Sequence, residues 1–283
     1  TQYLRDNGFM LAQALLPAQE IKNGEVSLQV LLGTLGDVVV EDNLQYRAKV
    51  LSNPFQTAVG DPVKLSTIES KILRLNDLPG LSTNAFFKAG DDLGETRMAI
   101  KVLEEDNFEL FFKADNYGAD VSGVARLSMG FTANNLSGYG DKLSVEGLKT
   151  FDSGDLSSVR ISYEITESEL IHTFGLDFSE SWYDIQGSLK NLGIDGDIEI
   201  GQLYMRSQWL KSRDLNVSTQ ISLALKRSNI FIGQLNRDEG VDRLAVARAS
   251  LVAEGASVRF RGIYRARLSI SQGLNNSFGS MNS

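Results

Sequence analysis

Residues 123–145, GVARLSMGFTANNLSGYGDKLSV, decide how the rest of the chain is interpreted. Apolar and polar side chains alternate over residues 123–133. The apolar positions are Ala125, Leu127, Met129 and Phe131, and the polar positions are Arg126, Ser128 and Thr132. Because successive side chains of a strand point to opposite faces, this period of two predicts a strand with one apolar and one polar face.

The letters GYGD, residues 138–141, also form the centre of the potassium-channel selectivity filter. A filter would lie between two apolar membrane-spanning helices, with carbonyl groups of four subunits converging. The chain has no run of 18 or more apolar residues, so neither helix is present. Asparagine, glycine and aspartate favour turns. We therefore expect residues 134–141 to connect two strands of a hairpin.

The same alternation recurs from Phe108 to the end of the chain. It is clearest in residues 157–166, 215–226 and 263–271. Segments of about ten residues with one apolar and one polar face are typical of outer-membrane β-barrel strands. A soluble sheet with one wet face gives the same alternation, so the pattern alone leaves both interpretations open.

The first 106 residues have a different character, and all four prolines lie before residue 80. The segment KLSTIESKILRLNDLPG (64–80) predicts a helix with Leu65, Ile68, Ile72 and Leu75 on one face. Ser66 and Glu69 have the spacing of a capping box, and Pro79-Gly80 should stop this helix.

Strands and a second helix are expected around that segment. The predicted strands are 26–32, 37–41, 82–88 and 96–104, and a short helix should cover 44–52 and end before Asn53-Pro54. From Gly36 the order is strand, helix, helix, strand, strand. Residues 1–33 fit the last helix and two strands of a preceding copy of that unit.

Composition excludes several classes of function. The 283 residues suffice for one to three domains. The absence of cysteine excludes disulfides and thiol chemistry, and the net charge of −8 argues against a nucleic-acid partner. His172 is the single histidine, which argues against a zinc site. Acidic groups such as FSESWYD (178–184) and GDDLGE (90–95) fit solvated strands and turns better than catalytic or calcium sites. We therefore expect no catalytic residue, no metal and no cofactor.

Five phrases, in order along the chain, resemble one protein family. They are residues 8–43, GDPVKLSTIESKILRLNDLPGL (60–81), 114–145, WLKSRDLNV (209–217) and LSISQGLNNSFGS (268–280). Each is weak alone, but the ordered series is similar to the outer-membrane transporters of two-partner secretion, the hemolysin and filamentous-adhesin exporters of the Omp85 superfamily. One departure is Gln208-Trp209, where the family has tyrosine-proline.

The resemblance implies an α+β fold of POTRA modules (β-α-α-β-β) followed by antiparallel transmembrane strands of a partial barrel. We expect residues 1–34 to be the C-terminal part of a first POTRA, 35–106 the second POTRA, and 107–283 the N-terminal part of the barrel. The signal peptide, the plug helix and the second half of the barrel that the family carries are not in this sequence, so a fragment is expected.

The resemblance also implies a function and two candidate surfaces. A secreted adhesin or hemolysin with an N-terminal secretion domain would bind the POTRA modules in the periplasm and cross the Gram-negative outer membrane through a monomeric, lipid-embedded barrel. An exposed strand edge could take the client by β-augmentation. The expected binding residues are Ser82, Thr83, Asn84, Ala85, Phe86 and Phe87, with Leu65 and Ile72 nearby. The expected lumen-lining residues are Arg160, Glu164, Gln220, Lys226, Arg265 and Arg267.

Each surface has a plainer interpretation. The helix residues fit the core of the module, which we favour for them, and the polar strand faces fit the wet side of a soluble sheet. An Omp85-type assembly factor that inserts other outer-membrane proteins is one alternative function. A soluble β-rich adhesin or binding protein is another.

Overall fold

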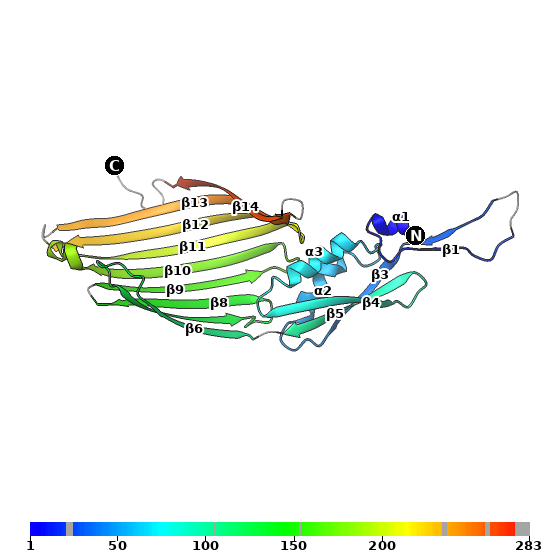
Figure 1. Cartoon of the computed structure of the whole chain (residues 1–283), viewed down its shortest axis with the longest axis horizontal. Helices are drawn as coiled ribbons and strands as arrows, with labels where there is room; N and C mark the ends of the chain where they lie inside the picture. The colour runs from blue at the N-terminus through cyan, green and yellow to red at the C-terminus, as the bar shows by residue number, and fades with distance from the viewer. Residues whose placement is uncertain (21–24, 105, 153, 234–236, 258–260, 275–283) are drawn as a thin grey trace.

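The computed structural model describes residues 1–20, 25–104, 106–152, 154–233, 237–257 and 261–274. The molecule is elongated (Figure 1), with a short hairpin at one end, a small mixed sheet with two helices in the middle, and a large sheet at the other end. The last nine residues of the expected barrel, 275–283, lie outside the described residues.

The N-terminal segment contains one helix and one hairpin. Helix α1 covers Gln2–Asp6, and strands β1 (Gln13–Leu15) and β2 (Gln29–Leu31) pair antiparallel with Ala14 opposite Val30. The structure therefore contains the expected helix and two strands, although β2 is shorter than the predicted strand 26–32.

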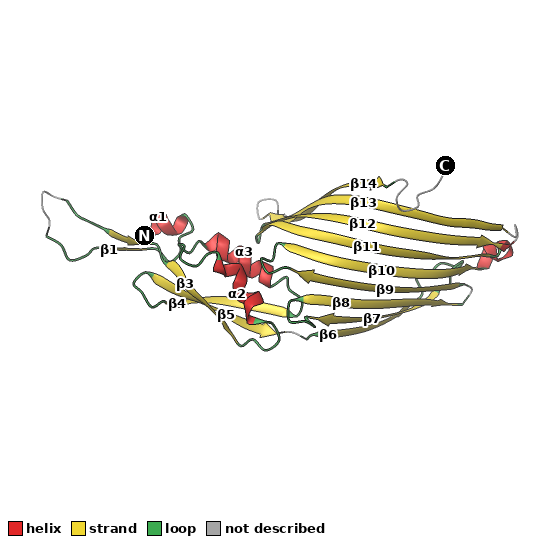
Figure 2. Cartoon of the chain, turned by 180° about the vertical axis from the view of Figure 1, so that it is seen from behind, coloured by secondary structure: helices red, strands yellow, loops and turns green. Residues whose placement is uncertain are grey.

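Residues 34–104 form the unit that we call the α/β module. Its elements are β3 (Thr34–Glu41), α2 (Ala48–Gln56), α3 (Leu65–Leu75), β4 (Leu81–Ala89) and β5 (Glu95–Glu104). The sheet order is β3-β5-β4, with β3 parallel and β4 antiparallel to β5. The predicted order of strand, helix, helix, strand and strand is thus confirmed. Both helices lie on one side of this sheet, next to the large sheet (Figure 2).

A closed hydrophobic core holds the α/β module together. Leu51 and Phe55 of α2, Leu75 of α3, and Met98 and Ile100 of β5 are completely buried. Each side chain of this size contributes about 1.5–3 kcal/mol when it leaves water. The apolar face predicted for residues 64–80 is therefore the face that α3 packs against the sheet.

Two predictions about the helix ends are wrong. Helix α3 begins at Leu65 after the N-cap Lys64, so Ser66 is already inside the helix and forms no capping bond. The backbone N–H of Leu65 donates instead to the carbonyl of Gly8, at 3.0 Å. Helix α2 does not stop before Pro54 but includes it and ends at Gln56. Burial of Pro54 and Phe55 in the core outweighs the one helical hydrogen bond that proline cannot make.

Nine antiparallel strands form the large sheet, each paired with its neighbours in the chain. They are β6 (Phe108–Asp115), β7 (Ala125–Asn134), β8 (Asp141–Phe151), β9 (Asp155–Thr166), β10 (His172–Ile185), β11 (Ile194–Lys211), β12 (Leu215–Ile232), β13 (Arg237–Ser257) and β14 (Gly262–Gly273). The short 3-10 helix η1 (Gly187–Leu192) joins β10 to β11. Strand length rises from 8 residues in β6 to 21 in β13. Within the described residues, β6 and β14 each pair on one side only, so the sheet is open.

The two faces of the nine-stranded sheet differ in chemistry. One face, the apolar face, exposes large side chains such as Leu203 (55%), Ile221 (56%) and Ile270 (70%). A row of charged residues follows these apolar side chains on the same face. Its members share that face because they lie opposite each other on neighbouring strands. That row consists of Glu180, Glu199, Arg227 and Arg243. Among the described residues, no helix is long and apolar enough to cross a membrane.

Candidate functional site

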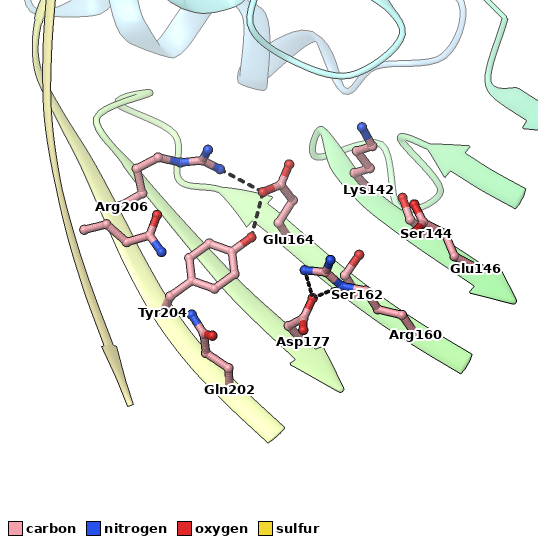
Figure 3. A pocket seen from close by; sticks show the side chains of 11 residues that line it. Lys142, Ser144, Glu146, Arg160, Ser162, Glu164, Asp177, Gln202, Tyr204 and Arg206 are labelled. Carbon is pink, nitrogen blue, oxygen red and sulfur yellow. Dashed lines mark hydrogen bonds and ion pairs between the residues drawn. The ribbon is translucent and has the colours of Figure 1, made fainter. Parts of the chain in front are cut away.

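The opposite, polar face of the nine-stranded sheet contains a cavity of about 400 Å³ next to the α/β module (Figure 3). Lys142 and Glu146 of β8 line it, together with Arg160, Glu164, Asp177, Tyr204 and Arg206. The last five come from β9, β10 and β11, and Figure 3 shows them projecting from one side of these strands.

Four of the six charged side chains in this cavity form two ion pairs. The guanidinium of Arg160 lies 2.7 Å from the Asp177 carboxylate, and Arg206 lies 2.8 Å from Oε2 of Glu164. The Tyr204 hydroxyl donates to the same Glu164 oxygen at 2.9 Å. The cavity wall is therefore strongly polar but carries little uncompensated charge.

A glycine makes room for the central tyrosine of the cavity. Gly175 lies directly opposite Tyr204 in the β10–β11 ladder. A Cβ atom at Gly175 would lie 2.1 Å from Cζ of the Tyr204 ring. Only glycine at this position lets the ring cross β10 and reach Glu164 on β9.

The cross-strand register places all six expected lumen residues on the polar face. Arg160, Glu164 and Gln220 line the cavity together. Lys226 follows Gln220 along the same face of β12 but lies outside the cavity. Arg265 and Arg267 belong to β14, where Arg265 lies opposite Glu254 and forms an ion pair with it at 3.0 Å. Their role in lining a lumen stays a prediction.

The expected binding strand 82–87 lies in β4, at the edge of the α/β module. In the described residues β4 pairs only with β5, so its outer edge has no strand partner. The other edge strand, β3, is partly covered, because Leu35 exchanges backbone hydrogen bonds of 3.0 and 2.7 Å with Asp61 and Gly60. The open edge of this sheet is therefore that of β4.

The expected binding residues do not all share one environment. Asn84 and Phe86 (52% exposed) face outward, whereas Ala85 and Phe87 pack against the core of the module. Ser82 is half-buried and Thr83 is buried. On α3, Ile72 is half-buried against the core, which fits the plainer interpretation that we favoured for the helix, while Leu65 is 46% exposed.

Sequence reasoning missed a residue that acts on this edge. Asn76, directly after α3, bonds to the main chain of Thr83 through both atoms of its side-chain amide. The signal was present in the phrase LNDLPG (75–80), where an asparagine separates the helix from its proline stop.

The α/β module is docked on the end of the nine-stranded sheet, and the GYGD turn forms part of the contact. Arg47 donates its backbone N–H to the carbonyl of Gly138 at 3.0 Å and its guanidinium to the Tyr139 hydroxyl at 2.7 Å. Gly138 and Gly140 both have positive φ, and a Cβ at Gly140 would lie 2.9 Å from Leu78. The predicted turn is confirmed, and its glycines also permit close approach of the module.

A second turn inserts a leucine into the module. Leu170, between β9 and β10, is 4% exposed and belongs to the hydrophobic core of the α/β module. Its φ of +59° is unusual for leucine and shows that the surrounding contacts hold it in place. Arg74 of α3 donates to its carbonyl at 3.0 Å, and Lys211 of β11 pairs with Asp77. We call these contacts, with those of the GYGD turn, the joint.

The turn that carries Leu170 is organised by one carboxylate. Burial alone would raise the pKa of Glu167, but three backbone N–H groups donate to it and lower its pKa below the ordinary value. The donors are Glu169 at 2.8 Å, Ile171 at 3.0 Å and His172 at 3.2 Å. The ionised form of Glu167 therefore holds the turn in the shape that presents Leu170.

The single histidine lies beside a serine rather than a metal site. Nδ1 of His172 is 2.8 Å from Oγ of Ser207, its neighbour across the β10–β11 ladder. Within the described residues no group of three or more histidine or acidic side chains could hold a metal ion. His172 contributes to the packing of the strand end, edge-on to Trp209.

Comparison with known proteins gives consistent likenesses. The family model of the haemolysin secretion/activation protein ShlB/FhaC/HecB matches residues 94–282, about two thirds of the chain. The heme/hemopexin transporter protein HuxB of Haemophilus influenzae (strain 86-028NP) is 27% identical over 224 residues, which are 78% of this chain and 40% of HuxB. The chain thus spans about 40% of the length of the curated relatives it matches.

Two solved structures share the fold. CdiB from Escherichia coli superposes with a TM-score of 0.80 at 18% identity, covering 98% of this chain and 51% of CdiB. BamA from Haemophilus ducreyi lacking POTRA domains 1–3 gives 0.59 at 14% identity, covering 98% and 56%. The family match, the order of the elements and the two-faced sheet agree with one another. The chain belongs to the haemolysin secretion/activation ShlB/FhaC/HecB family of two-partner secretion transporters.

Proposed function

We propose that this chain captures an extended segment of a secreted exoprotein in the periplasm and guides it across the outer membrane along the polar face of its barrel. In this proposal residues 1–34 end a first POTRA, 35–106 form the second, and 107–283 form the first part of a monomeric barrel. One observation carries the proposal. The open edge of β4 belongs to a module that is docked on the end of the sheet where the polar cavity lies.

The edge of β4 suits a client that is unfolded. An extended chain can pair with the free N–H and C=O groups of an edge strand whatever its side chains are. The exposed ring of Phe86 adds apolar contact, and Ala85 and Phe87 hold the strand on the core. Main-chain pairing thus supplies the affinity, and nearby side chains supply a modest preference among client sequences.

The polar face suits passage of a chain rather than retention. Arg160 with Asp177, and Arg206 with Glu164, neutralise each other inside the cavity. A wall of compensated charges surrounded by water offers a moving polypeptide many weak contacts and no strong one. The apolar face would contact lipid, because exposed leucine and isoleucine are unfavourable in water. No ATP is present in the periplasm, so folding of the client outside the cell is the driving force that we propose.

The proposal is tested most sharply at one main-chain atom. Ala85→Pro removes an outward N–H from the edge of β4 and leaves the pairing with β5 in place. We expect secretion of the partner exoprotein to fall strongly, while transporter levels in the outer membrane stay normal. Asp92→Ala, at an exposed position in the turn that follows β4, serves as the control. Normal secretion by Ala85→Pro would contradict capture at this edge, and deletion of 60–88 gives a coarser version of the test.

Two other functions are separable from this one. An assembly factor of this fold would have a different phenotype, because its loss would lower the levels of many outer-membrane proteins rather than one secreted protein. A soluble adhesin would be extracted without detergent, which the exposed side chains of the apolar face disfavour.

A further inference from the structure

We infer that Asn76 sets the register of client binding, because it occupies the edge of β4 at Thr83 and leaves only the stretch from Ala85 to Ala89 open for strand addition. The inference rests on the proposed capture by β4 and names the residue that limits it. Asn76 is thus a positioning residue for the client.

Three hydrogen bonds fix the side chain of Asn76 on the edge. Its Oδ1 accepts from the backbone N–H of Thr83 at 2.6 Å and from the Thr83 hydroxyl at 2.8 Å. Its Nδ2 donates to the backbone carbonyl of Thr83 at 3.2 Å. The side-chain amide therefore offers Thr83 the same donor and acceptor that a residue of an added strand would offer.

These bonds also show which residues of β4 remain open. Because Thr83 uses its N–H and C=O on Asn76, both groups point away from β5. The backbone groups of an antiparallel edge strand alternate in direction, so those of Ala85, Phe87 and Ala89 point outward as well. In the part of the chain that the structure describes, no hydrogen bond ties the outward groups of Ala85 or Phe87.

The occupied position lies at the end of β4 next to the nine-stranded sheet. Strand β4 begins at Leu81, immediately after Gly80, and a Cβ at Gly80 would lie 3.1 Å from Asn107 and 3.3 Å from Asn134. A client strand can therefore pair with the distant half of β4 but not with the half nearest the sheet. It must leave the edge before it reaches the polar face, and the short window keeps its binding weak and reversible.

The position of Asn76 in the fold makes it suitable for this role. It is the C-cap of α3, and its own backbone N–H bonds to the carbonyl of Ile72 at 3.0 Å. The helix thus holds the side chain beside β4 in advance. Aspartate at this position could still accept from the Thr83 N–H, but it would place a carboxylate oxygen against the Thr83 carbonyl, where no hydrogen bond is possible.

Hydrogen exchange on the full-length transporter in nanodiscs tests the geometry without a client. We expect slow exchange at the amide of Thr83 and fast exchange at those of Ala85 and Phe87. Asn76→Ala should speed exchange at Thr83 by about fivefold or more, the loss expected for one hydrogen bond, and leave β5 protected. Equal exchange at Thr83 in both proteins would overturn the inference. Asn76→Asp provides a second variant that keeps one of the two backbone bonds.

Crosslinking tests the effect on the client. A photo-crosslinking amino acid is placed singly at Ser82, Phe86 or Lys88, and the purified N-terminal secretion domain of the partner exoprotein is the probe. We expect crosslinks from Phe86 and Lys88 but not from Ser82, and Asn76→Ala should add crosslinks at Ser82. Asp92→Ala, at an exposed position in the turn that follows β4, should add none.

The outcomes separate the two proposals. Absence of crosslinks at all three positions would contradict capture by β4 itself. Crosslinks at Phe86 together with equal crosslinks at Ser82 in the unchanged protein would leave capture standing and overturn the role of Asn76.

Discussion

The α/β module and the nine-stranded sheet are built on opposite rules of burial. In the module, Phe55, Leu51 and Met98 are completely buried, and charged side chains lie outside. In the sheet, leucine and isoleucine are exposed on one face, while arginine and glutamate pair on the other. The module therefore buries its apolar side chains in a core of its own, whereas the apolar side chains of the sheet require an apolar environment outside the protein. One chain can therefore combine a region suited to water with a region suited to an apolar environment, and the joint lies between the two.

The largest expected effect comes from emptying the module core. Phe55→Ala should lower the free energy of unfolding of the module by about 3–5 kcal/mol, because a cavity remains where the ring was packed. Phe131→Ala on the apolar face should cost on the order of 1 kcal/mol, because lipid fills the space. Tryptophan fluorescence would report only on the sheet, because both tryptophans, Trp182 and Trp209, lie there. Hydrogen exchange measures the stability of each region separately. Equal losses of unfolding free energy for the two substitutions would contradict the difference between the two regions.

A second substitution tests whether the joint contributes to the stability of the α/β module. Leu170→Ala should destabilise the docked module by about 2–5 kcal/mol, because Leu170 completes the module core from outside. The chain has no cysteine, so spin labels at Asp92→Cys and Asn191→Cys report the distance between the two regions without background. We expect one narrow distance in the unchanged protein and a broad distribution in Leu170→Ala. Leu136→Ala, at an exposed leucine of the GYGD turn, should keep the narrow distance, and a broadened one there would contradict the assignment.

A third experiment exchanges the chemistry of the two faces. Ile221→Lys places a charge on the apolar face and should cost about 2–4 kcal/mol if that face contacts the bilayer interior. Gln220→Lys, one residue away on the polar face, should change stability little. Urea unfolding of the protein in lipid vesicles measures both. Similar costs for the two substitutions would show that both faces are wet and would favour a soluble sheet.

The smallest expected effect concerns acid. Because backbone donors lower the pKa of Glu167 in the folded protein, its contribution to stability is complete above the unfolded value of about 4.3 and is lost as the pH falls through the lowered folded value. The turn that carries Leu170 should therefore loosen below about pH 4. The spin-label distance should broaden in that range, and Glu167→Gln should already be broader at neutral pH and respond less to acid. An identical acid response in both proteins would assign the loosening to other groups.

The sequence predicted the features that depend on repetition. Period-two alternation identified the strands of the sheet because each residue there faces one of two uniform surroundings. Spacing alone predicted a helix within residues 64–80, where α3 covers Leu65–Leu75. The helix ends were predicted less well, because Gly8 replaces the expected capping box and burial tolerates Pro54.

The joint and the Asn76 contact could not be predicted in the same way. Both depend on single side chains that meet residues distant in the chain, such as Leu170 in the module core or Arg47 on Gly138. A turn motif predicts that the chain reverses but not what lies against the turn. The resemblance ordered the segments correctly, yet it did not distinguish glycines required by the turn from glycines required by a neighbour.

The unequal strand lengths have a consequence for the far side of the membrane. About 9–11 residues cross the hydrocarbon layer, and on β12 the apolar positions run from Val217 to Leu225 before the charged row begins at Arg227. The seven residues 226–232 would then rise roughly 23 Å further along the strand, at about 3.3 Å per residue. Strand β6, with 8 residues, has no such extension. In the proposed orientation the long strands would extend beyond the membrane on one side of the barrel opening, and the short strands would not. An emerging segment would therefore reach the outside first above the short strands.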